Sequence, residues 1–256
     1  MRPALRYHGG KWKLASWIIS HFPEHRTYVE LYGGGGSVLL RKPRSYAEIY
    51  NELDGEIVNV FRMLRDNGLE LKRVLTATPF ARAEFDFASH QDAAVTPLER
   101  ARRTIIKSFM GFGSDSIKRK SGFRANSKRS GTSPAHDWAN YADCLDELVT
   151  RLRGIVIENR NALDLFQQHD APTTLFYADP PYVHSTRTAS KRYAFEMTDD
   201  DHRKLATALH GVQGKVIVSG YDCPLYQELY AGWRVERKDA LADGARKREE
   251  CLWLNF

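Results

Sequence analysis

Apolar and polar positions form two different patterns along this chain, and together these patterns predict a mixed α/β protein. Apolar residues that recur every three or four positions, as at Ile57, Phe61 and Leu64, predict amphipathic helices. Short apolar runs bounded by Gly, Pro and polar residues predict strands. These runs lie at residues 28–32, 46–50, 155–158, 175–178, 215–219, 233–237 and 250–256. Because helical patterns alternate with the strands, we expect a sheet with helices on both faces.

The middle of the chain has a different character. From residue 69 to about residue 154 helical patterns dominate, as in Leu98–Met110 and Trp138–Leu152, with a polar stretch at 111–136 between them. The sequence therefore predicts one α/β domain made of residues 1–68 and 155–256. It also predicts an inserted, mainly helical lobe at residues 69–154.

The most informative run is the strand at 175–178, which ends in Asp179-Pro180-Pro181-Tyr182. In an open α/β sheet, ligands bind at the carboxyl ends of the strands. The two prolines fix their own φ and restrict the residue before each of them, so Asp179 and the Pro180 carbonyl are held stiffly. Two acceptors that converge beside an aromatic ring suit a planar amine, such as the exocyclic amino group of a base. The alternative is a turn at a strand end in which Asp179 serves as a cap.

A glycine-rich turn follows the first predicted strand. Gly33 to Gly36 separate that strand from a predicted helix, which is the arrangement that brings a ligand against backbone N–H groups. The turn is not a P-loop, because no Gly-Lys-Ser/Thr follows. It also departs from the dinucleotide fingerprint, because Val38 stands where the last glycine belongs. Glu30, just before the turn, adds an acid that could meet a hydroxyl or a cation.

Two further segments complete a predicted nucleoside site. The opening segment places Tyr7, Gly10 and Lys11 close together, where glycine permits close backbone approach and lysine supplies a cation; a plain turn into a helix is the alternative. At the end of the second strand, Glu52 is positioned to bind the hydroxyls of a ribose. Asp54 competes for that role, or caps the next helix instead. These features predict a Rossmann-like half that binds a nucleoside-type cofactor.

Basic stretches point to a polyanionic partner. Residues 117–129 carry six cations and no acid, and at full extension they would reach on the order of 40 Å, far enough to pass many DNA phosphates. Ser, Asn and Gly interleaved with Phe123 favour a loop that also contacts base edges; a solvated loop is the alternative. A second basic loop spans 183–195, and we expect residues 246–248 to form a basic turn.

Composition adds weaker limits. The chain has 256 residues, enough for one substantial core with a smaller lobe, and its net charge of +6 favours a polyanion without requiring one. Its three cysteines lie far apart and show no metal-ligand spacing, which favours a reducing cytoplasm and no metal. No apolar run is long enough for a membrane helix, and residues 1–10 lack the apolar core of a signal peptide.

Taken in order, these motifs resemble the Dam-type family of S-adenosylmethionine-dependent DNA adenine-N6 methyltransferases. The resemblance extends from Arg6 to Phe256, apart from the helical lobe, where such enzymes diverge. Asp in the first position of the tetrad is typical of enzymes that act on adenine in DNA. Two departures are Glu52, where the family usually has Asp, and Asn161, where an Asp commonly meets the cofactor's adenine. The other matching motifs are Tyr7…Gly9-Gly10-Lys11, Glu30…Tyr32…Gly34…Gly36, Asn51-Glu52, Ser219-Gly220-Tyr221 and the ending Trp253-Leu254-Asn255-Phe256.

The resemblance implies a Rossmann-like class I methyltransferase sheet in the α/β domain and a target-recognition function for the inserted lobe. It implies a site-specific enzyme that methylates the N6 amino group of a flipped-out adenine in double-stranded DNA, in restriction-modification or in epigenetic regulation. The expected protein is a cytoplasmic monomer or homodimer. The implied catalytic residues are Asp179, Pro180, Pro181 and Tyr182. The implied cofactor-binding residues are Tyr7, Gly10, Lys11, Glu30, Tyr32, Gly34, Gly36, Glu52, Asn161 and Asp179. The expected DNA-binding residues are Lys118, Arg119, Lys120, Arg124, Asn126, Lys128, Arg129, Arg187, Lys191 and Arg192.

Three alternatives remain at this level. The same tetrad chemistry could serve an adenine in RNA or an amide nitrogen in a protein. A non-catalytic DNA-binding regulator would keep the fold without the chemistry, although the intact tetrad and glycine turn argue against it. A nicotinamide-dependent oxidoreductase is disfavoured by the missing last glycine.

Overall fold

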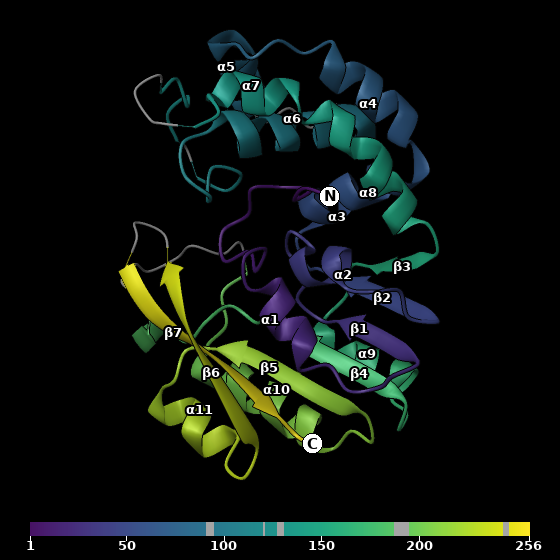
Figure 1. Ribbon diagram of the computed structural model, residues 1–256, viewed down its shortest axis with the longest axis vertical. Coiled ribbons are helices and arrows are strands. Elements are labelled where there is room, and N and C mark those ends of the chain that lie inside the picture. The colour runs from purple at the N-terminus through teal and green to yellow at the C-terminus, as the bar shows by residue number, and fades with distance from the viewer. Residues whose placement is uncertain (91–94, 120, 127–130, 187–194, 243–245) are drawn as a thin grey trace. The chain divides into compact units, whose positions relative to one another are not determined.

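The computed structural model describes residues 1–90, 95–119, 121–126, 131–186, 195–242 and 246–256 (Figure 1). Two compact units emerge from it, and the chain passes between them several times. The first consists of Met1–Trp12, Gly34–Arg41 and Asp54–Ile157, and the second of Lys13–Gly33, Lys42–Leu53 and Glu158–Phe256. The lobe expected at 69–154 lies wholly within the first unit, which also takes in both the N-terminal segment and the helix that follows Asp54.

A seven-stranded sheet runs through the described residues in the order β3-β2-β1-β4-β5-β7-β6. β1, β2, β4 and β5 pair in parallel, whereas β7 is antiparallel to both β5 and β6. The mixed α/β class predicted from the sequence is therefore confirmed. The strands are β1 (Thr27–Glu30), β2 (Ala47–Asn51), β3 (Ile155–Glu158), β4 (Thr174–Ala178), β5 (Lys215–Gly220), β6 (Arg234–Ala242) and β7 (Arg246–Leu254).

Within the second unit, the central strands are buried on both faces, which explains their nearly continuous apolar sequences. On one face, Phe176 of β4 packs with Leu165 and Leu205 in a core that also contains Tyr226. Helix α1 lies on the other face (Figure 1). Phe22, just after this helix, packs against Tyr28 and Tyr177 on that face. The helices of this unit are α1 (Ala15–Ser20), α9 (Ala162–His169), α10 (Asp199–His210) and α11 (Pro224–Leu229), with a 3-10 turn at His184–Thr186.

The first unit is mainly helical in its described residues. Its long helix α6 starts at a Thr96 cap with Pro97 in the first turn, a combination that favours helix initiation. Phe109, on α6, lies 4.3 Å from the ring of Tyr141, whose hydroxyl donates to the carbonyl of Ala4. The helices are α2 (Ser37–Arg41), α3 (Gly55–Asp66), α4 (Gly68–Thr76), α5 (Arg82–Ser89), α6 (Pro97–Met110), α7 (Pro134–Ala139) and α8 (Leu145–Leu152), with a 3-10 turn at Ala142–Cys144.

One local expectation is wrong. Residues 246–248, expected to form a basic turn, belong to strand β7, which pairs with β6 along its whole length. The strand ladder is made by backbone N–H and C=O groups, so a run of basic residues does not by itself end a strand.

Candidate active site

Two acids follow neighbouring strands of the sheet at the same edge. Glu52 is the first residue after β2, and Asp179 is the first residue after β4. Both strands pair in parallel with β1, where Glu30 is in register with Tyr50 and with Tyr177. Because the carboxyl ends of parallel strands meet at one edge, Glu52 and Asp179 flank the end of β1, where ligands bind in open α/β sheets.

Glu30, the last residue of β1, is buried and interacts within its own strand. Its Oε2 accepts a hydrogen bond of 2.7 Å from the hydroxyl of Tyr28. Burial first, and then the charge of Glu30, raise the pKa of Tyr28 well above its ordinary value, so this phenol remains a neutral donor. Glu30 is thus held on the α1 side of the sheet edge.

The backbone around Glu52 is fixed by two asparagines. The buried side chain of Asn51 donates to the carbonyls of Leu31 and Arg160, at 2.9 Å and 3.0 Å, and its oxygen accepts from the Arg160 amide. Asn159 donates to the carbonyl of Glu52 at 2.7 Å. From the sequence Asn51 was only part of a motif; the structure shows that it joins two loops at the sheet edge.

The remaining predicted cofactor residues of the second unit show different degrees of exposure. Tyr32 is largely buried, and burial, followed by the charges of Asp201 and Glu52, raises the pKa of its hydroxyl. Asn161 is exposed and caps α9, accepting a hydrogen bond of 3.0 Å from the amide of Leu163. Its oxygen therefore has a structural role at the position where the family commonly has Asp.

The tetrad Asp179-Pro180-Pro181-Tyr182 leaves the sheet directly from the fully buried β4. Asp179 keeps part of its surface accessible, whereas Pro180 and Tyr182 are buried. No helix begins at the tetrad, which argues against a purely capping role for Asp179. Tyr177 lies beneath it; burial first, and next the Asp179 carboxylate, raise the pKa of this tyrosine well above its ordinary value. The acid thus stands at the end of an apolar strand.

Tyr182 contacts one acid, Glu250 on β7, and one aromatic ring, Tyr221, which follows β5. Its hydroxyl donates a hydrogen bond of 2.6 Å to Oε2 of Glu250 on β7. Its ring meets the ring of Tyr221 edge-on, with 4.6 Å between centroids. Tyr221 follows β5 and was part of a predicted motif, whereas sequence reasoning missed Glu250, whose only signal was an acid at the start of the last predicted strand.

In the first unit, the N-terminal segment packs on the glycine turn. Gly34 has φ +47°, and a Cβ there would lie 2.7 Å from the ring of Tyr7. Gly10 donates its N–H to the Tyr7 carbonyl at 3.2 Å, and Lys11 is buried beside it. Gly36, with φ +64°, faces the ring of Phe61 in the same way. Four of the predicted cofactor residues, Tyr7, Gly10, Gly34 and Lys11, thus share one local structure, in which glycine is required.

Asp54 takes the helix-capping role that the sequence left open. Its carboxylate accepts from the amide of Glu56 at 3.0 Å, at the start of α3, and it lies 3.4 Å from the ammonium group of Lys118. Lys118 also donates to the hydroxyl of Tyr7 at 2.9 Å. Within the first unit, the Lys118 ammonium therefore has two polar partners, Asp54 and Tyr7.

The described residues on either side of position 120 are tied back to the end of α6. Gly111 and Phe123 form a β-bridge, and Phe112 donates its N–H to the Gly122 carbonyl. The ring of Phe123 packs against Phe80 and Phe85, at 5.0 Å and 6.0 Å between ring centroids, so it anchors this loop within the first unit.

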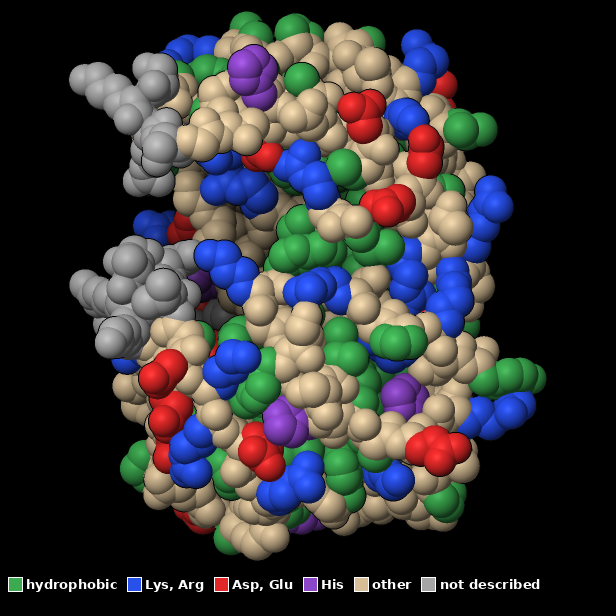
Figure 2. All heavy atoms as spheres, viewed as in Figure 1, with side chains coloured by type: hydrophobic (Ala, Val, Ile, Leu, Met, Phe, Trp, Pro, Cys, Tyr) green, Lys and Arg blue, Asp and Glu red, His purple; other side chains and the backbone are tan. Residues whose placement is uncertain are grey.

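Besides Lys118, three predicted DNA-binding residues lie among the described residues, and each keeps accessible surface. Arg119 is 57 % exposed in its side chain and lies 3.4 Å from Asp115, Arg124 lies 3.4 Å from Asp137, and Asn126 is exposed. On the face shown in Figure 2, basic and acidic side chains are interspersed. Lys120, Lys128, Arg129, Arg187, Lys191 and Arg192 lie outside the described residues.

Two other kinds of feature are absent from the described residues. They contain no cluster of His, Cys, Asp and Glu with the geometry of a metal site. None of the helices in this part of the chain combines the length and the apolar character needed to span a membrane.

Comparison with known proteins places this chain in a family. The model of D12 class N6 adenine-specific DNA methyltransferases matches residues 7–243. A curated relative, the Type II methyltransferase M1.LlaDCHI of Lactococcus lactis subsp. cremoris, is 23 % identical over 267 aligned residues, covering 96 % of this chain and 90 % of its own. Among solved structures, the rRNA methyltransferase aviRa from Streptomyces viridochromogenes matches with a TM-score of 0.43 and 14 % identity, over 97 % of this chain and 85 % of that one. The match over nearly the whole chain shows that this protein belongs to the D12 class of N6 adenine-specific DNA methyltransferases.

Proposed function

We propose that this DNA adenine methyltransferase uses S-adenosylmethionine as its methyl donor and carries out the transfer at Asp179-Pro180-Pro181-Tyr182. The observation that carries the proposal is the position of the tetrad. It leaves the buried strand β4 at the same sheet edge as Glu30 and Glu52, so that one acid is available for a base and others for a cofactor.

The residues present suit this cofactor. At Gly34 and Gly36 positive φ values and closely packed rings exclude any side chain, so the turn after β1 keeps its backbone uncovered by side chains of its own. Glu52 can accept hydrogen bonds from ribose hydroxyls, and its longer arm compensates for the absence of Asp. The other proposed cofactor contacts are Tyr7, Gly10, Lys11, Glu30, Tyr32, Asn161 and Asp179. When bound, the cofactor supplies a methyl group made electrophilic by its sulfonium.

The protein's own groups act on the acceptor nitrogen. The lone pair of an exocyclic amine is delocalised into the base, which makes N6 a poor nucleophile. The carboxylate of Asp179 and the carbonyl of Pro180 would accept its two N–H groups and favour a pyramidal nitrogen with a localised lone pair. As the nitrogen becomes positively charged, these fixed acceptors stabilise the transition state more than the ground state.

The base must leave the helix to reach this site. Flipping costs a few kcal/mol, and stacking on the ring of Tyr182 offsets about 1–3 kcal/mol of it.

We propose that Arg119, Arg124 and Asn126 contact the DNA, together with the basic residues at 120, 128, 129, 187, 191 and 192. Since the curated relative is named a Type II methyltransferase, we also propose a restriction-modification role.

The test is methylation with radiolabelled S-adenosylmethionine on unmethylated genomic DNA, with total RNA and a protein extract in parallel. We expect label in DNA, at N6 of adenine when modified bases are mapped by sequencing. Asp179→Ala should reduce turnover more than tenfold and leave DNA binding largely intact. Asp164→Ala, which removes an exposed acid on α9, serves as control. Label that enters only RNA or protein, or an Asp179→Ala enzyme that keeps a tenth of its turnover, would overturn the proposal.

A further inference from the structure

Glu250 is a buried acid for which the catalytic scheme above has no role. It lies on β7, next to Cys251, which pairs with Gly220 at the end of β5. Since β7 runs antiparallel to β5, its first half lies at the carboxyl edge of the sheet, where the tetrad leaves β4. Only 7 % of Glu250 and 6 % of Tyr182 are exposed.

The contact between these two residues is short and has a fixed direction. The hydroxyl of Tyr182 lies 2.6 Å from Oε2 of Glu250. Burial, and then the charges of Glu250 and Asp179, raise the pKa of Tyr182 well above its ordinary value, so the phenol stays protonated and donates. A hydrogen bond from a neutral donor to a carboxylate is among the stronger ones in proteins, and it is shielded here from competing water.

A second contact restricts the plane of the same ring. Tyr221 meets it edge-on, at 4.6 Å and 76°, and the guanidinium of Arg248 lies 5.7 Å from the Tyr221 ring. With its hydroxyl tied to Glu250 and its ring beside Tyr221, Tyr182 has little rotational freedom. A ring held in this way is preorganised for stacking before the base arrives, and it loses little entropy on binding.

We propose that Glu250 is a positioning residue that holds the Tyr182 ring in the orientation needed to receive the flipped adenine. This inference rests on the proposed function, because it assigns the tetrad tyrosine to base stacking. Glu250 does not touch the reacting atoms in this scheme, and acts through the Tyr182 hydroxyl. A purely structural acid would instead stabilise the sheet without any specific dependence on that hydroxyl.

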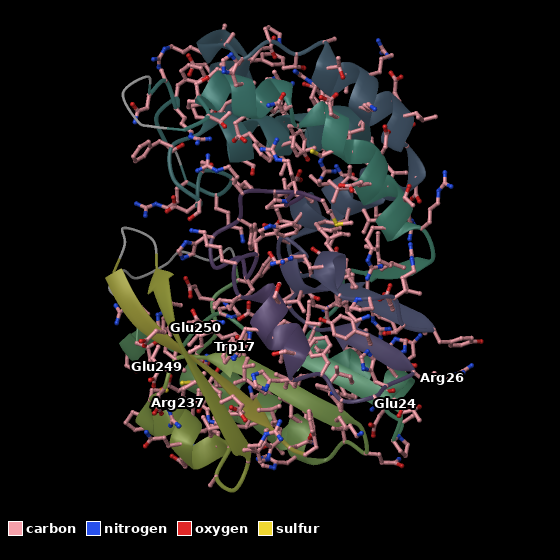
Figure 3. All side chains as sticks on the ribbon, viewed as in Figure 1. Trp17, Glu24, Arg26, Arg237, Glu249 and Glu250 are labelled. Atoms are coloured by element: carbon pink, nitrogen blue, oxygen red, sulfur yellow. The ribbon has the colours of Figure 1, made fainter. Side chains whose placement is uncertain are left out.

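The neighbouring Glu249 provides a matched control. Successive residues of a strand point to opposite faces, and Glu249 pairs with Arg237 of β6 at 3.3 Å, where both side chains are about half exposed (Figure 3). Glu249→Gln and Glu250→Gln therefore make the same chemical change on adjacent residues. Only Glu250→Gln affects the bond to Tyr182.

The experiment is a double-mutant cycle of Glu250→Gln and Tyr182→Phe, which keeps the ring but removes its hydroxyl. Turnover on unmethylated phage DNA, affinity for S-adenosylmethionine and thermal unfolding are measured for the wild type, both single variants, the double variant and Glu249→Gln. We expect each single variant to lose about tenfold in turnover, roughly the effect of one charge-assisted hydrogen bond, and the double variant to lose no more than either. Cofactor affinity should stay within about twofold, and Glu249→Gln should match the wild type.

The outcomes separate the two proposals. A wild-type protein without methyl transfer to DNA would defeat the proposed function. With an active wild type, additive losses in the double variant, or a Glu250→Gln enzyme as active as Glu249→Gln, would overturn the positioning role. A parallel loss of unfolding temperature, cofactor affinity and turnover would show that Glu250 is only structural. Should Glu250→Gln fail to fold, Tyr182→Phe alone tests the proposal. If Tyr182→Phe kept full activity, the hydroxyl through which Glu250 is proposed to act would be dispensable, and the positioning role would be overturned.

Discussion

The ammonium group of Lys118 donates a hydrogen bond of 2.9 Å to the hydroxyl of Tyr7, and it lies 3.4 Å from the carboxylate of Asp54. Tyr7 in turn covers the glycine turn at Gly34. One residue of the basic loop is thus connected to the segment proposed to bind the cofactor, within a single compact unit. This relationship changes the expected consequence of removing Lys118.

We expect Lys118→Met to weaken binding of S-adenosylmethionine about fivefold. The methionine preserves the apolar stem, but the Tyr7 hydroxyl loses a charged donor, a change worth about 1 kcal/mol at this partly buried position. Calorimetric titration with the cofactor measures the effect, and Arg119→Met, which removes an exposed cation next in the sequence, is the control. If Lys118→Met bound the cofactor as tightly as the wild type but showed a weaker salt dependence of DNA binding, Lys118 would contact a phosphate instead.

Gly34→Ala should destabilise the protein and abolish cofactor binding. An alanine at φ +47° costs about 1–2 kcal/mol in backbone strain, and its Cβ would overlap the ring of Tyr7 at 2.7 Å. Gly232→Ala is the matched control, because Gly232 has φ +83° but open space around its Cβ position. Denaturant unfolding should show a lower free energy of unfolding for both variants, and the decrease should be about 1–3 kcal/mol larger for Gly34→Ala. Equal losses would mean that Tyr7 moves aside easily.

Arg119→Gln should reduce the salt dependence of DNA binding. Each lost phosphate contact lowers the slope of log K against log salt by about 0.9. The control is Arg203→Gln on α10, since Arg203 is similarly exposed and ion-paired, to Glu228. Fluorescence anisotropy with duplex DNA at several salt concentrations gives both slopes. If the two variants behave alike, Arg119 is a solvated side chain of the lobe.

Local patterns predicted the elements well because they depend on neighbours in sequence. The apolar face of α3, with Ile57, Phe61 and Leu64, is buried as its spacing predicted. The tetrad follows β4, and the glycine turn follows the loop after β1. Asp54 illustrates the limit of such reasoning, since sequence alone could not choose between a cap and a ribose ligand.

Contacts between distant residues were beyond sequence reasoning. Lys118 lies in a run that is typical of a solvated or DNA-binding loop, yet its partner Tyr7 is 111 positions away. Likewise, nothing in the sequence around Phe123 indicates that its ring packs against Phe80 and Phe85. The extent of the first unit was equally hidden, because nothing in the α3 sequence tells which helices its apolar face packs against.

Asn51→Ala should lower stability by about 3 kcal/mol. The substitution removes the hydrogen-bond partner of three backbone groups: the carbonyls of Leu31 and Arg160 and the amide of Arg160. Each unsatisfied group costs about 1–3 kcal/mol, and relaxation or water recovers part of that cost. Asn67→Ala is the control, because Asn67 is exposed and makes no side-chain cap bond to α4, and we expect a change within about 0.5 kcal/mol. Asn51→Asp distinguishes hydrogen bonding from size. It keeps the acceptor for Arg160 but turns a carboxylate toward two carbonyls, so it should destabilise at least as much as alanine. If Asn51→Asp were as stable as the wild type in denaturant unfolding, the two bonds that Asn51 donates would not be what holds the loops beside Glu52.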